Sequence, residues 1–510
     1  MSSDVSQLPR LKNGEACSLA AVPRLSFDDF RKCIVAQAVG PVRLASFFGQ
    51  PRDDGGVRLY AVLADNNEGV LLPVSTDLFD DKYPSLTTDC PQAHNFEREL
   101  AEQWGLVPEG HPWLKPLRYH PSYRHGHDAW GRLPADRILP AVTDYFRVSG
   151  AEIHEVAVGP VHAGVIEPGS FRFQCHGEHV FHLEVQLGYQ HRGVERALIG
   201  GPNKRTLHYI ETLAGDTSIG HATAYCQAVE GLAEVTPSPR AQSIRAIALE
   251  LERLACHTGD LGALADDVGF LPTANFCGRL RGDFLNATGT ICGNRFGRSL
   301  VRPGGVTFDI TAEMATTLTT RLKAALRDVG GAAQLLWDSL SVRARFENTG
   351  AVSSEDAEAL GIVGVALRAT GIERDVRQNF PTGAYSRAAM PVATWPTGDV
   401  FARAYVRWLE IENSGEFVLD QLHTLPSGSC RTEVGSLAAD SFVASLAEGW
   451  RGPVCHVAIT DAAGKFARYK VVDPSFQNWT GLMLALRDQQ ISDFPLCNKS
   501  FNLSYCGHDL

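Results

Sequence analysis

The fold of this chain is decided by the stretch Pro237–Leu264, which reads PSPRAQSIRAIALELERLACHTGDLGAL. The prolines and serine at its start are typical of a helix N-terminus. Aliphatic side chains then recur at intervals of three or four residues, or sums of these, which places them on one helix face: Ile244, Ile247, Leu251, Leu254, Leu261 and Leu264. The stretch therefore predicts a long amphipathic helix that packs in a core.

A second helical pattern and an earlier strand pattern lie on either side of this stretch. Apolar residues at helical spacing predict a helix that ends before Gly330-Gly331: Met314, Leu318, Leu322, Leu326 and Val329. Apolar and polar residues alternate from Phe181 to Leu187, which predicts a strand. From residue 151 onward we therefore expect a helical core with peripheral β elements.

The N-terminal part of the chain has a different pattern. Val57–Leu63 is rich in β-branched and aromatic residues between turn-forming segments, which predicts a strand, and Gly69–Val74 is its expected hairpin partner. Asn95–Trp104 predicts a short helix that ends at Gly105. These elements indicate a small, separate α/β domain.

A polar connection from His120 to about residue 150 follows this unit. Its histidines His120, His125 and His127 could indicate a metal site, but a histidine-containing tract alone is weak evidence. We interpret the connection as a solvated linker. The predicted fold class is α+β, with an α/β domain over residues 1–125, a linker over 126–150 and a mainly helical domain over 151–510.

Composition narrows the classes of function. With 510 residues, 44% hydrophobic residues and a net charge of −11, the chain is an ordinary globular protein that we do not expect to bind nucleic acid. No stretch reaches the roughly 20 apolar residues needed to span a bilayer, and Met1–Gln7 lacks the features of an export signal. The 12 cysteines include no C-x-x-C pair, so we expect any metal centre to lie in a partner.

One run in the N-terminal unit resembles a known subunit signature. Phe96-Glu-Arg-Glu, Trp104-Gly-Leu and Gly110-His-Pro112 follow each other as in the 30-kDa subunit of respiratory complex I. This short signature implies that the N-terminal unit is a 30-kDa-like domain.

The region from Glu152 to Leu510 resembles the large-subunit family shared by [NiFe] hydrogenases and the 49-kDa quinone-site subunit of complex I. The resemblance rests on motifs in the family's order: Gly159-Pro-Val-His-Ala-Gly164, Leu187-Gly-Tyr-Gln-His-Arg-Gly-Val-Glu195, Leu249-Glu-Leu-Glu-Arg-Leu-Ala-Cys-His257 with Asp266-Asp-Val-Gly269, Gly293-Asn-Arg-Phe296, Arg302-Pro-Gly-Gly305, and Arg368-Ala-Thr-Gly-Ile372 with Asp375-Val-Arg377. The layout resembles a fused 30-kDa/49-kDa subunit of an energy-converting hydrogenase-related complex.

The two nickel-binding loops of the hydrogenases are altered in this chain. The first loop, a C-x-x-C in hydrogenases, has Ala214 and Thr217 in the cysteine positions, and the second has Ser475 and Asn478. A methyl, a hydroxyl or an amide cannot replace a soft thiolate. We therefore expect no metal in this chain.

Other hydrogenase positions keep their residue types and leave alternatives open. Glu195 matches a glutamate near the metal centre, or it is a first-turn glutamate that complements a helix dipole. Arg451 matches an arginine above the active site that needs an anion or carbonyl partner, or it packs against Trp450. His221 is expected to support the site or to lie in the core.

The comparison with complex I gives a mixed result. Its quinone site uses a tyrosine and a histidine that pairs with a carboxylate. His162 matches the histidine and Asp267 the carboxylate, but the tyrosine position falls on Gly215, which removes a hydrogen-bond donor. With Arg451, the residues His162 and Asp267 are the candidate catalytic set, and the resemblance implies that they handle charge and protons.

The resemblance implies a peripheral subunit on the cytoplasmic side of the inner membrane. The expected partners are an iron–sulfur small subunit similar to the 20-kDa subunit of complex I, and antiporter-like and other membrane subunits. The expected function is electron transfer, linked to NADH or quinone, that is coupled to ion translocation. The cluster would lie in the partner, and quinone is the candidate ligand. The alternatives are a redox-inactive coupling subunit and, against the altered cysteine positions, a [NiFe] hydrogenase.

Overall fold

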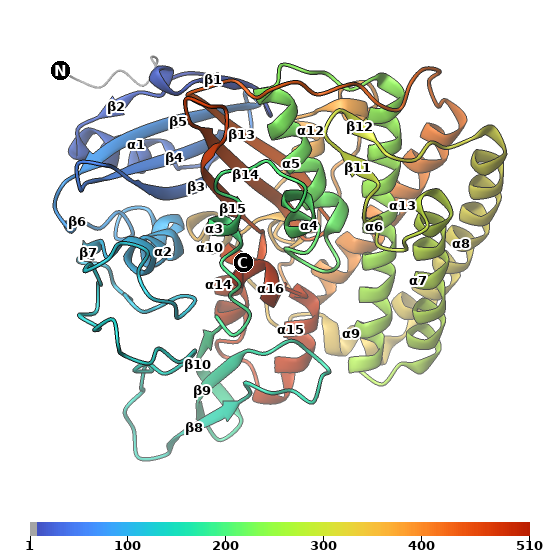
Figure 1. Cartoon of the computed structure of the whole chain (residues 1–510). Helices are drawn as coiled ribbons and strands as arrows, with labels where there is room; N and C mark the ends of the chain where they lie inside the picture. Colours follow the sequence, from blue (N-terminus) through green and yellow to red (C-terminus); the bar gives the residue numbers. More distant parts are fainter. Residues whose placement is uncertain (1–7) are drawn as a thin grey trace.

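The computed structural model describes residues 8–510, so the expectation about an export signal in Met1–Gln7 lies outside the described residues. The chain folds into helices and several separate sheets, which confirms the α+β class (Figure 1). The N-terminal unit lies at one side, a set of long helices lies at the other, and a sheet from the C-terminal part of the chain lies between them.

The N-terminal unit is a four-stranded sheet with two helices. Its strands β2 (Arg24–Leu25), β3 (Val42–Pro51), β4 (Val57–Asp65) and β5 (Val70–Leu78) are arranged in the order β2-β5-β4-β3. The predicted hairpin is confirmed, since β4 and β5 pair antiparallel. Helices α1 (Phe27–Gln37) and α2 (His94–Trp104) accompany the sheet, and α2 ends at Gly105 in the left-handed region, as the sequence predicts. Short strands β6 (Lys82–Pro84) and β7 (Val107–Glu109) pair beside α2.

The helical part is built on α6, which spans Pro239–Asp267. The side chain of Ser238 caps the helix by accepting the N–H of Ala241. All six predicted stripe residues are buried, so the prediction from the opening stretch is confirmed. Helix α6 packs against α7 (Leu271–Cys292) and α13 (Val400–His423), and α8 (Ala312–Asp338) packs against α7.

The predicted end of α8 is wrong. The helix continues through Gly330 and Gly331 to Asp338. Glycine weakens a helix by about 1 kcal/mol relative to alanine, but the apolar stripe resumes beyond the pair with the buried Ala332, Ala333 and Leu336. Burial of this continued stripe against the neighbouring helices outweighs the local propensity.

Two further sheets have three and four strands. Strands β8 (Ile153–Val158), β9 (Ser170–His176) and β10 (His179–Gln186) form one, and β10 contains the predicted strand. The central sheet is made of β1 (Ala16–Ser18), β13 (Ser441–Gly449), β14 (Gly452–Thr460) and β15 (Phe466–Val472) in that order. Helices α3 (Val194–Ala197), α4 (Thr206–Ile210) and α5 (Ser218–Leu232) follow β10 along the chain and lead to α6. Between α7 and α8, the strands β11 (Val301–Arg302) and β12 (Gly305–Val306) form a small hairpin.

Short helices complete the chain. Between α8 and α13 lie α9 (Leu340–Phe346), α10 (Ser354–Ala359), α11 (Gly364–Arg368) and α12 (Val376–Asn379). After β15 come α14 (Ser475–Ala485), α15 (Phe494–Phe501) and α16 (Tyr505–Asp509). The last two helices are largely buried, so the C-terminal tail is ordered and packs on the body.

The N-terminal unit shares its hydrophobic core with the central sheet. Residues from β3, β4 and β5 form one cluster with residues from β13, β14 and β15. The rings of Tyr60 and Phe442 stack with centroids 6.3 Å apart, and β1 pairs directly with β13. The N-terminal unit and the central sheet thus bury a common apolar surface.

The connection between β7 and β8 has no regular secondary structure, as expected of a linker. His120 at its start is nevertheless buried, and its ring stacks between those of Tyr123 and His191 at 4.6 Å from each. His127 pairs with Asp81 at 2.6 Å. The interpretation of these histidines as solvated is therefore wrong for His120, because aromatic stacking holds it against the body.

Candidate functional site

The two altered loops meet in the folded chain beside Arg451. The first loop, Ala214–Thr217, precedes α5, the second lies in the first turn of α14, and Arg451 lies in the tight turn between β13 and β14. A guanidinium nitrogen of Arg451 lies 3.3 Å from the hydroxyl of Thr217. Arg451 is therefore in contact with one of the altered cysteine positions.

Arg451 forms a bidentate ion pair with Asp216, which lies between the two altered positions of the first loop. The two nitrogen–oxygen distances are 2.6 and 2.8 Å. Arg451 also donates to the carbonyl of Asn502 at 2.5 Å, and its guanidinium lies 3.9 Å from the ring centroid of Trp450. Both alternatives for Arg451 hold together, since it has an anion partner and packs on the tryptophan.

Asp216 is a site residue that the sequence reasoning missed. Burial opposes its ionisation, but the charge and hydrogen bonds of Arg451 outweigh burial and hold the pKa of Asp216 below its ordinary value. The carboxylate therefore supplies the negative charge that Arg451 requires. The sequence did contain a signal for this residue. Asp216 is an acidic residue between the altered positions Ala214 and Thr217, and a buried arginine needs an anion close by.

The side chains at the cysteine positions make ordinary structural contacts. The hydroxyl of Ser475 accepts the N–H of Ser504 at 2.8 Å. The amide of Asn478 accepts the N–H of Val363 at 2.9 Å and donates to its carbonyl at 3.0 Å. Ala214 is buried and has no polar side-chain atom. These groups do not fit nickel, because its sites in this family depend on thiolate donors.

His221 belongs to a row of four buried side chains that are joined by hydrogen bonds. Its Nε2 lies 3.1 Å from Oδ2 of Asp473, and its Nδ1 lies 3.0 Å from Nε2 of His456. The Nδ1 of His456 lies 2.8 Å from the hydroxyl of Tyr469. Asp473 directly precedes the second altered loop, so one end of this row is adjacent to the site.

Glu195 lies in a buried network of charges that joins three parts of the fold. It pairs with Lys470 at 2.9 Å and with Arg468 at 3.0 Å, both on β15. Lys470 also contacts Glu99 of α2, which pairs with Arg118. Burial opposes ionisation of Glu195, but Lys470 and then Arg468 outweigh burial and lower its pKa well below the ordinary value.

Comparison with known proteins matches both halves of the chain to subunits of one enzyme. Residues 267–443 match the family of the respiratory-chain NADH dehydrogenase 49-kDa subunit, and residues 22–130 match that of its 30-kDa subunit. An NADH-quinone oxidoreductase subunit of Desulforamulus reducens is 30% identical over 343 residues, which cover 66% of this chain and 92% of that protein. The chain belongs to the 49-kDa subunit family. Its N-terminal part is a fused 30-kDa-like unit.

The chain is also similar to a formate hydrogenlyase subunit and to a hydrogenase. Formate hydrogenlyase subunit 5 of Escherichia coli (strain K12) is 27% identical over 450 residues, 86% of this chain and 78% of that protein. The carbon monoxide-induced hydrogenase of Rhodospirillum rubrum is 29% identical over 353 residues, 68% of this chain and 97% of that protein. The similarity of this chain to a hydrogenase agrees with the resemblance that the sequence motifs indicate.

The structure does not bring His162 and Asp267 to Arg451. The Nε2 of His162 lies 2.8 Å from the carbonyl oxygen of Gly169 in its own loop. Asp267 is exposed at the C-terminal end of α6, where partial burial raises its pKa to about 6 against the opposing charge of Lys499. Their proposed roles stay predictions that rest on the resemblance to the 49-kDa subunit.

Gly215, at the tyrosine position of the quinone site, borders open space. No described atom, apart from its chain neighbours, lies within 4 Å of the place where a side chain would begin. The absence of a phenol therefore leaves room beside the Asp216–Arg451 pair.

Glu252 borders a small cavity of about 20 Å³ together with Asp216 and Cys256. Its two carboxyl oxygens accept the N–H groups of Ile219 and Gly220, at 2.8 and 3.1 Å, in the first turn of α5. Burial, aided by the charge of Asp216, outweighs these hydrogen bonds and raises the pKa of Glu252 to about 8. Glu252 is thus a second titratable residue at the site that the sequence reasoning missed.

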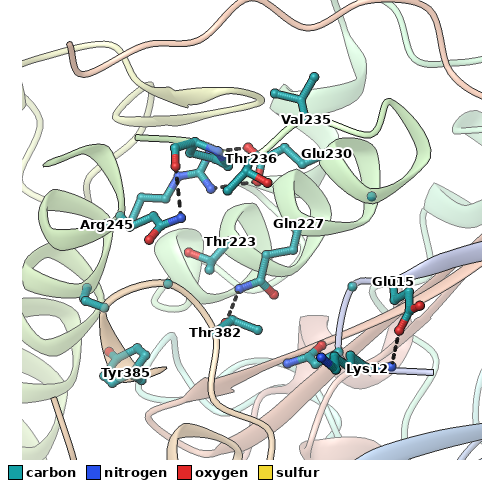
Figure 2. Close-up of a pocket in the computed structure, with 18 of the residues that line it drawn as sticks. Lys12, Glu15, Thr223, Gln227, Glu230, Val235, Thr236, Arg245, Thr382 and Tyr385 are labelled. Carbon is teal, nitrogen blue, oxygen red and sulfur yellow. Dashed lines mark hydrogen bonds and ion pairs between the residues drawn. The ribbon is translucent and has the colours of Figure 1, made fainter. Parts of the chain in front are cut away.

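A larger open pocket of about 500 Å³ lies between the N-terminal segment, α5 and α6 (Figure 2). Gln227 donates to Thr382 at 2.7 Å across it, and Glu230 pairs with Arg245 in its wall. A third pocket, of about 740 Å³, lies between α2, α10 and α14 and includes His94, His111 and Trp113. Neither pocket includes the altered loops.

Proposed function

We propose that this chain is a peripheral subunit of a membrane-associated oxidoreductase related to complex I and to energy-converting hydrogenases. It takes part in electron transfer coupled to ion translocation, and it holds no nickel. The observation that carries this proposal is the Asp216–Arg451 ion pair between the altered loops, in a chain of the 49-kDa family. No helix among residues 8–510 is long and apolar enough to cross a membrane.

The proposed partners follow from the fused layout. An iron–sulfur subunit similar to the 20-kDa subunit of complex I would hold the cluster, and antiporter-like subunits would move the ions. Quinone is the proposed acceptor or donor at the open space beside Gly215. The proposed division of the chain is a 30-kDa-like domain up to residue 125, a linker to residue 150 and a 49-kDa-like domain to residue 510. The proposed location is the cytoplasmic side of the inner membrane.

The test is isolation of the native complex through an affinity tag on this chain after mild detergent treatment. We expect membrane subunits and an iron–sulfur subunit in the isolated complex, an iron–sulfur signal in electron paramagnetic resonance, and far less than one nickel per chain. A chain that is recovered alone from the soluble fraction contradicts membership of a membrane complex. Stoichiometric nickel contradicts the proposed loss of the metal.

A second candidate function is a coupling subunit without a redox-active site. It is favoured by the saturated contacts of Arg451, which already has an anion, a carbonyl and an aromatic partner. Electron transfer by the assembled complex distinguishes the two. If Arg451→Ala and Asp267→Asn both assemble and leave turnover unchanged, the coupling function holds. A tenfold loss in either variant, about 1.4 kcal/mol of transition-state stabilisation, supports a live site.

A further inference from the structure

The chain of Asp473, His221, His456 and Tyr469 is not explained by the proposed function. All four side chains are buried, and three successive hydrogen bonds of 3.1, 3.0 and 2.8 Å connect them. They come from three different elements and one loop, namely α5, β14, β15 and the segment after β15. Four titratable groups in one uninterrupted line can exchange protons among themselves.

The chemistry of these groups determines the direction of the hydrogen bonds when no extra proton is present. Oδ1 of Asp473 accepts the N–H of Ser475 at 2.8 Å, so Oδ2 is left to accept the Nε2–H of His221. Neutral His221 then has a bare Nδ1, which must accept the Nε2–H of His456. The bare Nδ1 of His456 accepts the hydroxyl proton of Tyr469.

One added proton is accommodated by reversing two of these bonds. His221 becomes an imidazolium that donates from Nε2 to Asp473 and from Nδ1 to His456. His456 shifts its proton from Nε2 to Nδ1 and donates to the oxygen of Tyr469, whose own hydroxyl proton turns away. The tyrosine stays neutral and no electron moves. The new positive charge lies against the Asp473 carboxylate, which stabilises it in the buried interior.

We propose that Asp473, His221, His456 and Tyr469 form a binding site for one proton, held on His221 against Asp473 and signalled by a tautomer change of His456. This site goes beyond the proposed electron transfer and does not depend on it. Because Asp473 precedes the second altered loop, the site would keep one proton next to the Asp216–Arg451 pair. A proton-accepting group thus lies beside the place where the family holds its metal.

Burial and neighbouring charges affect the members of this hydrogen-bonded row differently. Burial and the neighbouring His221 lower the pKa of His456, and Glu195 opposes them. Burial opposes ionisation of Asp473, but His221 and then Arg451 outweigh burial and lower its pKa. Four further groups lie near the two ends: Tyr225 and Cys226 of α5 and Cys455 of β14 near Tyr469, and Asp216 near Asp473.

The test is a pH titration of the full-length chain labelled with ¹⁵N-histidine, in which long-range ¹H–¹⁵N spectra report the protonation of each ring nitrogen. The resonances are assigned with His221→Gln and His456→Gln. At high pH we expect both histidines to carry their proton on Nε2. As the pH falls, His221 gains a second proton, and in the same transition His456 changes to the Nδ1–H tautomer.

Two variants show whether Asp473 holds the proton. Asp473→Asn keeps the shape of the side chain but removes its charge, so the midpoint of His221 should fall by at least one pH unit. Tyr225→Phe is the matched control, because its ring lies 6.4 Å from that of Tyr469 outside the hydrogen-bonded chain, and it should leave the midpoint in place. In the unsubstituted chain, an unchanged His456 tautomer during protonation of His221 overturns the proposal. So does a His221 that stays neutral until the chain unfolds.

Discussion

Arg451 and Asp216 form a two-pronged ion pair between the two altered loops, with nitrogen–oxygen distances of 2.6 and 2.8 Å. Arg451 comes from the turn between β13 and β14, and Asp216 comes from the loop before α5, so the pair ties the central sheet to the helical part. The pair joins segments that are 235 residues apart in the chain, next to the altered cysteine position Thr217.

Asp216→Asn should destabilise the chain by about 1–2 kcal/mol at neutral pH. The substitution removes the anion that pairs with a buried arginine. Such a loss costs about 3–5 kcal/mol when both partners are buried. The Asp216 side chain is 35% exposed, so solvent reduces the cost. Urea unfolding measures the change. Glu68→Gln, which removes an exposed pair with Arg10, is the control and should change stability by less than about 0.5 kcal/mol. Equal effects of the two substitutions would show that the Arg451 pair has no special role.

Glu195→Gln should lower the free energy of unfolding most at neutral pH and least in acid. The pKa of Glu195 is lowered in the folded chain by Lys470 and Arg468, although burial opposes this. Its stabilisation is therefore fully present above the unfolded pKa of about 4.5 and is lost as the pH falls through the folded pKa. We expect a loss of about 3 kcal/mol at pH 7. The measurement is the free energy of unfolding from pH 3 to pH 7, and a difference that does not shrink toward pH 3 contradicts the prediction.

Glu252→Gln should remove a decline of stability between about pH 5 and pH 8. Burial raises the pKa of Glu252 from about 4.5 in the unfolded chain to about 8. The folded chain therefore keeps a proton that the unfolded chain releases, and this contribution to stability is lost as the pH rises. Over this interval, the free energy of unfolding of the original chain should fall by up to about 1.4 kcal/mol per pH unit more than that of the variant. Parallel stability curves for the two proteins would refute the raised pKa.

Asp267→Asn should raise the free energy of unfolding slightly at neutral pH, by less than about 1 kcal/mol, because ionisation of Asp267 is disfavoured in the folded chain and solvent screens this exposed side chain. Thermal or urea unfolding measures this effect. The same variant also allows the pKa of Asp267, expected at about 6, to be assigned in a carboxyl-carbon NMR titration. A loss of more than about 2 kcal/mol would mean that Asp267 is buried in the folded chain.

Local patterns in the sequence were sufficient for several elements. The spacing of apolar residues predicts α6 and the strand in β10, and the turn-forming segments predict the β4–β5 hairpin. The end of α2 at Gly105 also follows from the sequence, because glycine adopts the left-handed region with little strain. The end predicted for α8 at Gly330-Gly331 is wrong, since local propensity there yields to burial of residues that come later in the chain.

The sequence by itself determined that four thiolate positions are altered and that the chain has the motif order of the 49-kDa family. Those facts depend only on residue identity at spaced positions. Only the tertiary structure decided that Asp216 meets Arg451, that His221 joins His456 and Tyr469, and that Asp267 lies apart from them. The partners are up to 235 residues apart in the sequence, and their contacts arise because burial of a shared hydrophobic core brings distant segments together.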